Sequence, residues 1–172
     1  MSKNAILYLE NFLLEKENTE PITKEKLVDF KFPKGEYFGY YNPETGEVYY
    51  KHKMEYPKKP KGNWYQWHNH PKGISGYPSE IDLVDMIEMD DSDPNYSYGY
   101  DGLYEFKIKD MKHAKAAWKE MKDELGIKSF QEYIGIHNKL PHRPDSEYEK
   151  FTNSIAKRIG AVIIKHKANS LS

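Results

Sequence analysis

The sequence predicts an α/β fold of the α+β kind, in which a mixed central β-sheet is flanked by helices. Tyrosine-rich segments separated by turn residues fill much of the first two thirds of the chain, whereas amphipathic patterns closed by glycines fill the last third. A length of 172 residues suits one well-packed domain and is short for two. We therefore expect a single domain over residues 1–172, divided into a helical extension (1–32), a core (33–110) and a helical C-terminal part that ends in a strand (111–172).

The N-terminal part is expected to hold two helices and a β-hairpin. Apolar residues spaced three and four apart predict a helix over residues 4–16, and a shorter helix follows over 24–30. Segments 36–41 and 47–54 are rich in Tyr, Phe and Val, which favours strands. The sequence Asn42-Pro43-Glu44-Thr45-Gly46 between them is typical of a turn.

The middle of the chain is expected to continue the sheet around one helix. Residues 63–68 and 103–108 are predicted strands, with further tyrosine-rich extended chain before the second of them. The helix begins after Ser79, whose hydroxyl can cap it, and Asp82 stands where a carboxylate closes a capping box.

Three helices and a buried final strand are predicted in the C-terminal part. The helices cover residues 111–125, 129–137 and 145–159, and the strand covers 161–164. Gly126 and Gly160 are the expected stops of the first and last of these helices.

Composition excludes several classes of function. The chain has no cysteine, so disulfides, thiolate metal sites and cysteine nucleophiles are absent, and any metal must be held by His, Asp or Glu. The 26 basic and 27 acidic residues nearly balance, which gives no global field to attract nucleic acid or anionic lipid. No apolar run approaches the roughly 20 residues of a membrane span, and no signal peptide is recognisable. We expect a cytoplasmic chain without nucleic-acid or membrane partners, or else a domain delivered as part of a secreted effector.

The sequence Trp67-His68-Asn69-His70-Pro71 contains two histidines that can bind one metal ion. Residues two apart on a strand point to the same face, and Asp82 could fold back across the intervening glycine-containing loop to add a carboxylate. Hydrolytic zinc sites commonly use three protein ligands and leave the fourth position for water. A His-X-His pair that stands alone is more often a pair of surface or structural imidazoles.

The pair does not stand alone, because Pro78-Ser79-Glu80-Ile81-Asp82 follows it. Together the two segments resemble the motif of the JAMM (JAB1/MPN/Mov34) zinc metallopeptidases, in which an upstream Glu is followed by His-X-His-Pro and Ser-X-X-Asp. The prokaryotic and toxin-associated branches are the most similar, and the resemblance covers about residues 36–87. Eleven residues separate His70 from Asp82, one more than is usual in the family, and a glycine-containing loop absorbs such an insertion easily.

This resemblance implies a cytidine-deaminase-like JAB/MPN core that holds Zn²⁺ through His68, His70 and Asp82. It further implies a metal-dependent hydrolase that cleaves an amide or isopeptide bond in a protein or peptide substrate, conjugates of ubiquitin-like proteins included. Bacterial effector, toxin and phage-associated domains are the relatives of similar appearance.

The resemblance also implies a glutamate base and a hydroxyl that stabilises the tetrahedral oxyanion. Glu36, in Gly35-Glu36-Tyr37-Phe38-Gly39, resembles the Glu-X-X-Gly pattern on the first strand of many members, while Glu47 and Glu55 remain alternatives. Ser79 would be the oxyanion donor in addition to capping its helix.

Two other functions remain open at this point. The domain could be a catalytically inactive MPN-type scaffold, although inactive relatives typically lose ligands and all the ligand types are present here. The letters His-Asn-His also occur in metal-dependent nucleases, but there the histidines are widely spaced on a ββα unit. Of the other residues, His137 and His142 are expected at the surface and Trp118 in the core.

Overall fold

The structure, a computed structural model, describes residues 36–51, 56–141 and 144–166. The elements in chain order are β1 (Phe38–Asn42), β2 (Glu47–Lys51), β3 (Tyr65–Asn69), α3 (Glu80–Glu88), β4 (Asn95–Gly99), β5 (Gly102–Ile108), α4 (Met111–Leu125), α5 (Phe130–His137), α6 (Asp145–Ile159) and β6 (Ala161–His166). The strands form one sheet in the order β2-β1-β3-β4-β5-β6. All neighbouring strands are antiparallel except β3 and β4, so the mixed sheet and the α+β class are confirmed.

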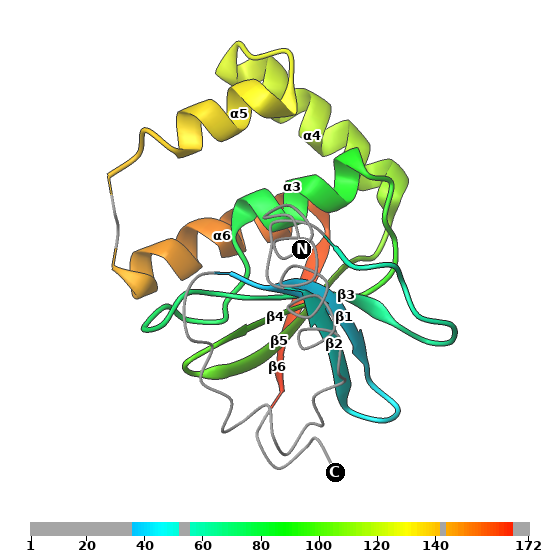
Figure 1. The fold of residues 1–172 in the computed structure, drawn as a ribbon. Helices are drawn as coiled ribbons and strands as arrows, with labels where there is room; N and C mark the ends of the chain where they lie inside the picture. Colours follow the sequence, from blue (N-terminus) through cyan, green and yellow to red (C-terminus); the bar gives the residue numbers. More distant parts are fainter. Residues whose placement is uncertain (1–35, 52–55, 142–143, 167–172) are drawn as a thin grey trace, which may run out of the picture.

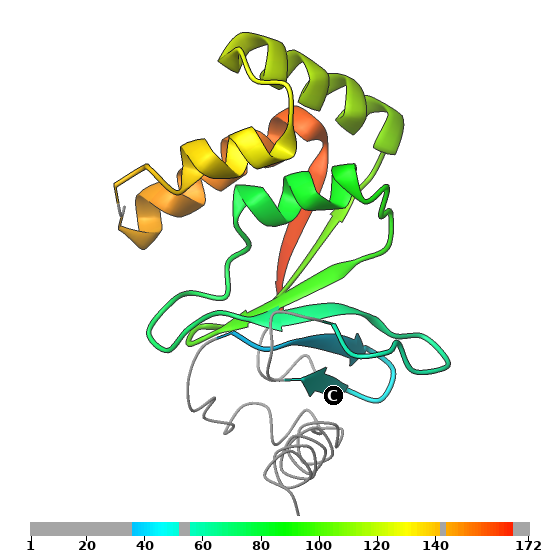
Figure 2. The same ribbon diagram turned by 45° about the horizontal axis from the view of Figure 1, so that its top comes forward.

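The four described helices cover one face of the sheet (Figures 1 and 2). Helix α3 connects β3 to β4, and α4, α5 and α6 together connect β5 to β6. The helices and β5 share a core whose buried members are Leu83, Val84, Met86, Ile87, Phe106, Ile108, Ala114, Ala117, Trp118, Met121, Tyr133, Ala156 and Ile159. Trp118 packs edge to face on Tyr133, which confirms its predicted place in the core. None of the helices in the described ranges has the length and apolar character of a membrane span.

A second, aromatic core lies on the other face of the sheet. Its buried members are Tyr37, Tyr41, Val48, Tyr50, Trp67, Tyr96 and Leu103. Successive residues of a strand point to opposite faces, so Trp67 enters this core while His68 points to the helical side. The register agrees, because Trp67 pairs with Tyr96 in the aromatic core and His68 pairs with Ser97.

The predicted hairpin and helix ends are confirmed in detail. The Asn42 side chain accepts hydrogen bonds from the backbone N–H groups of Glu44 (2.9 Å) and Thr45 (3.3 Å), which closes the turn between β1 and β2. Gly126 and Gly160 end α4 and α6 in the left-handed conformation, as expected of C-terminal stops. The predicted helices over 4–16 and 24–30 lie outside the described residues.

The prediction of a buried final strand is wrong. Within the described part of the chain, β6 is an edge strand: it pairs with β5, and no further described strand lies on its other side. Its residues are half-buried or exposed, and Ile164 is 43% exposed. An apolar run does not distinguish an edge strand from a central one, because both need β-branched residues.

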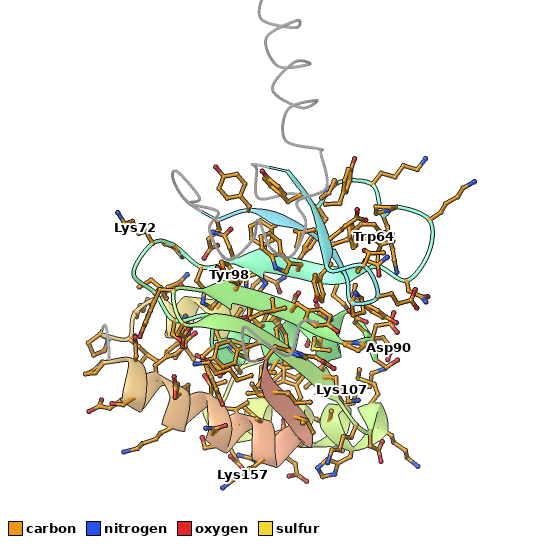
Figure 3. All side chains as sticks on the ribbon, turned by 90° about the horizontal axis from the view of Figure 1, so that it is seen from below. Trp64, Lys72, Asp90, Tyr98, Lys107 and Lys157 are labelled. Carbon is orange, nitrogen blue, oxygen red and sulfur yellow. The ribbon has the colours of Figure 1, made fainter. Side chains whose placement is uncertain are left out.

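The loop from β3 to α3 crosses closely over the end of β4. A Cβ atom on Gly76 would lie 2.5 Å from the Gly99 nitrogen, so neither glycine can carry a side chain. Asp101 accepts hydrogen bonds from the Ser75 hydroxyl and the Gly76 N–H, both at 2.7 Å. In Figure 3, Lys72 of this loop and Tyr98 of β4 lie to the left of Trp64 and Asp90.

The glycine contact makes a prediction about stability. We expect Gly76→Ala to lower the free energy of unfolding by about 1–3 kcal/mol, because the new methyl group must displace backbone atoms. Gly135→Ala is the matched control, since no atom lies within 4 Å of the added methyl on α5. The control should be neutral or stabilising by up to about 1 kcal/mol. Urea denaturation measures both, and equal stabilities of the two variants would contradict the prediction.

Candidate metal centre

His68, His70 and Asp82 converge on one point at the helical side of the sheet. Their ligand atoms all lie within 4.8 Å of one another. The Nε2 atoms of the two histidines are 3.2 Å apart, and His68 Nε2 is 3.6 Å from Asp82 Oδ1. Ligands at about 2.0–2.1 Å from a tetrahedral zinc ion are separated by about 3.3 Å. Two imidazole nitrogens and a carboxylate oxygen at these separations fit a zinc ion.

The backbone around His70 fixes which of its nitrogens faces the site. His70 follows the last residue of β3, and its N–H donates to the Tyr98 carbonyl of β4 at 2.7 Å. Its Nδ1 lies 2.5 Å from the Ser75 carbonyl oxygen. Because a carbonyl only accepts, Nδ1 carries the proton, and Nε2 of the neutral ring presents its lone pair to the site. The loop from β3 to α3, through the Ser75 carbonyl, therefore sets the tautomer of His70.

The two carboxylate oxygens of Asp82 have different partners: one caps α3 and the other faces the histidines. Oδ2 accepts hydrogen bonds from the N–H and hydroxyl of Ser79 at 2.7 and 2.9 Å, while the Ser79 oxygen accepts from the Asp82 N–H at 3.1 Å. This is the predicted capping box of α3, now observed. Oδ1 is the oxygen that approaches His68. The cap therefore holds the carboxylate with Oδ1 directed toward the two histidines.

His68 is buried beside an aromatic ring. Its imidazole stacks on Phe38 at a centroid distance of 5.9 Å and an angle of 21°. Burial lowers the pKa of His68 below its ordinary value, Asp82 opposes this shift and His70 adds to it. The ring is therefore neutral near pH 7, which is the form that binds metal.

Glu36 lines the same cavity, which has a volume of about 440 Å³. Tyr37, the next residue, is held to β3 by two hydrogen bonds. Its N–H donates to the Asn69 side chain at 2.5 Å, and the Asn69 N–H donates to the Tyr37 carbonyl at 3.2 Å. Burial raises the pKa of the Glu36 carboxyl, His70 opposes this shift and Asp82 adds to it. Of the rival glutamates, Glu47 begins β2 beside the turn and does not line the cavity, and Glu55 lies outside the described residues.

Residues from α5, its C-terminal cap and α6 complete the cavity, and no pattern in the sequence predicts their presence there. They are Ile134, His137, Asn138 and Tyr148. Tyr148 shares a hydrogen bond with Ser79, and its pKa is raised far above the ordinary range, chiefly by burial, so its hydroxyl stays protonated. These residues follow the motif by more than fifty positions, and nothing in their spacing marks them as neighbours of the histidines.

The surface position predicted for His137 is wrong. Its side chain is 30% exposed, and its Nδ1 bonds to Glu80, whose side chain is only 1% exposed. The other Glu80 oxygen has no hydrogen-bond partner among the described residues. His137 is therefore the hydrogen-bonding partner that a buried carboxylate requires. The companion residue, His142, lies outside the described ranges.

This pair allows a test of the contact between α3 and α5. We expect His137→Ala to lower the free energy of unfolding by about 1–3 kcal/mol, because Glu80 would stay buried without a partner. Asn138→Ala, at the exposed neighbouring position, should change it by less than about 0.5 kcal/mol. Chemical denaturation of both variants measures the difference, and a His137→Ala protein as stable as the control would refute the role of the pair.

The structure thus brings the five predicted site residues, Glu36, His68, His70, Ser79 and Asp82, around one cavity. Comparison with known proteins adds no relative, since no protein-family model, no curated protein and no solved structure matches the chain. The resemblance to the JAMM metallopeptidases consequently rests on the motif residues alone.

Proposed function

We propose that the protein is a zinc-dependent metallopeptidase or isopeptidase of the JAMM kind. The observation that carries the proposal is the convergence of His68, His70 and Asp82 beside the half-buried Glu36. Two neutral imidazoles and one carboxylate are the ligand set of many hydrolytic zinc sites. A carboxyl group next to such a set supplies the proton transfer that amide hydrolysis needs.

The metal and Glu36 would divide the chemistry between them. A zinc ion, when bound, supplies Lewis acidity that lowers the pKa of water toward neutrality and polarises an amide carbonyl. Glu36 takes a proton from the attacking water and delivers it to the nitrogen of the leaving amine as the C–N bond breaks. The raised pKa of Glu36 suits both halves of this transfer, because a base with a pKa nearer neutrality accepts and releases a proton more readily.

Ser79 and Tyr148 are the proposed hydroxyl groups near the developing oxyanion. The Ser79 hydroxyl donates to Asp82, so it must turn away from that carboxylate in order to donate to an oxyanion. Tyr148, hydrogen-bonded with Ser79 and held protonated by its raised pKa, can then serve as a second donor. We therefore propose that the main role of Ser79 is to hold Asp82 in place, and that donating a hydrogen bond to the oxyanion is its second role.

The substrate class follows from this chemistry as an amide or isopeptide bond in a protein or peptide. Conjugates of ubiquitin-like proteins, and a role as a bacterial effector or phage-associated domain, belong to the same proposal. An inactive MPN-type scaffold would be favoured instead if the protein bound zinc and cleaved nothing.

Metal binding is the first test of the proposal. The protein refolded with excess zinc and then dialysed should retain one zinc ion per chain by mass spectrometry. His70→Ala and Asp82→Asn should weaken zinc binding by at least about 100-fold, because each removes one of three ligands. His113→Ala is the control, since His113 lies on α4 away from the cluster and should leave the zinc content unchanged. If the native chain retained no zinc after dialysis, the proposed enzymatic function would be refuted.

The base is tested separately from the metal. Glu36→Gln should retain zinc and lower the rate of hydrolysis of a quenched-fluorescent peptide library by about 10²–10⁴-fold, because the amide cannot take up the proton of water. Glu47→Gln, at the rival position outside the cavity, should retain both zinc and activity. Unchanged hydrolysis by Glu36→Gln would show that another group is the base.

A further inference from the structure

Two cavities continue from the metal site along the gap between α5 and α6. The nearer one has a volume of about 400 Å³ and shares Ile74, His137 and Tyr148 with the metal cavity. The farther one, of about 300 Å³, shares His137, Leu140 and Phe151 with the nearer. We call the two together the α5–α6 groove. Because each cavity shares lining residues with the next, the groove lies directly beside the metal site.

The walls of the groove are mainly apolar. They include Met121, Tyr133, Ile136, Leu140, Phe151 and Ile155. Leu140 is 41% exposed and Ile136 is 38% exposed, although both are large aliphatic side chains. Apolar surface gathered in a concave site beside catalytic groups is typical of substrate pockets.

Charged residues line both ends of the groove, and Glu80 lines both of its cavities with a side chain that is only 1% exposed and is paired with His137. Arg158 at the far end is held by Glu124 through two hydrogen bonds of 2.5 and 2.7 Å, and Asp145 lies toward the metal end. Because Glu80 is almost fully buried and already paired with His137, a charged side chain placed in the middle would lose its hydration without reaching an exposed group of opposite charge. The groove therefore suits an uncharged, apolar occupant.

His137 stands where the groove meets the metal cavity, since it lines all three cavities. Its Nδ1 is engaged by the buried Glu80, which fixes the orientation of the ring. No hydrogen bond to its Nε2 is found among the described residues. That nitrogen is available to a polar backbone group of a chain that passes from the metal site into the groove.

We propose that the α5–α6 groove binds an apolar side chain of the substrate, of leucine or phenylalanine type, on the residue next to the bond that is cleaved. The inference rests on the proposed metallopeptidase function and adds a specificity to it. His137 is a positioning residue in this scheme, and the aliphatic walls select the side chain.

The test uses the zinc-loaded full chain and a series of N-acetyl amino-acid hydroxamates, which chelate zinc and carry one side chain each. The leucine and phenylalanine compounds should bind about 10- to 100-fold more tightly than the glycine compound, because the groove removes their side chains from water. The aspartate compound should bind no more tightly than the glycine compound. Isothermal titration calorimetry measures all four affinities without any need for a cleavable substrate.

Variants separate the groove from the metal. Leu140→Asp and Ile136→Asp alter two exposed walls of the groove and should reduce the leucine preference to less than about threefold, with the glycine affinity unchanged. Met89→Asp, which is 67% exposed and lies outside the groove, should keep the full preference. Circular dichroism establishes that each variant is folded.

The possible failures are distinguishable. Equal affinity for all four hydroxamates by a protein that holds zinc would overturn the groove and leave the metallopeptidase proposal standing. A preference for leucine that survives both groove variants would place the side chain elsewhere and would also overturn the inference. A chain that retains no zinc would overturn the proposed function, and the groove inference with it.

Discussion

The close passage of the chain over the end of β4 is the constraint on which the site depends. The chain leaves β3 at Asn69, crosses the end of β4, the parallel neighbour of β3, and begins α3 at Glu80. The contact of Gly76 with Gly99 allows this crossing at backbone distance. The carbonyl of Ser75 then meets His70, and the cap of α3 turns Asp82 toward His68. His68 on β3, His70 just after it and Asp82 on α3 meet because the two backbones cross so closely.

The same groups serve folding and chemistry at once. Ser79 and Asp82 satisfy the first N–H groups of α3, an arrangement that stabilises any helix. In this chain the cap also leaves one carboxylate oxygen free for a cation and places a hydroxyl beside it. Burial is the main cause of the raised pKa of Glu36, the nearby Asp82 adds to it, and a bound cation would act in the opposite direction. A site of this kind is stable as a fold and has the donor atoms that a cation needs.

Much of the fold could be predicted because its signals are local. Capping residues, terminal glycines and the turn at Asn42 each act within a few residues, and all were observed where expected. The metal cluster could be anticipated because strand alternation and a cap position it within fifteen residues of chain, from His68 to Asp82. The contributions of His137 and Tyr148 could not, because they depend on how α5 and α6 pack over α3. The edge position of β6 was missed for the same reason, since the order of strands in a sheet is not a local property.

The loop between the two halves of the motif shows that its length is not what sets the geometry. Gly73 adopts a positive φ of 84° with open space around it. It lies in an exposed turn, closed by a hydrogen bond from the Ile74 N–H to the Pro71 carbonyl at 3.0 Å, between the hydrogen-bonded residues His70 and Gly76. A residue added to this exposed turn lengthens the loop without moving His70 or Gly76. The ligands can therefore keep their positions while the distance between them along the chain drifts. A search that fixes the number of residues between the second histidine and the aspartate would pass over chains of this kind, whereas one that asks for the strand, the paired glycines and the capped carboxylate would find them.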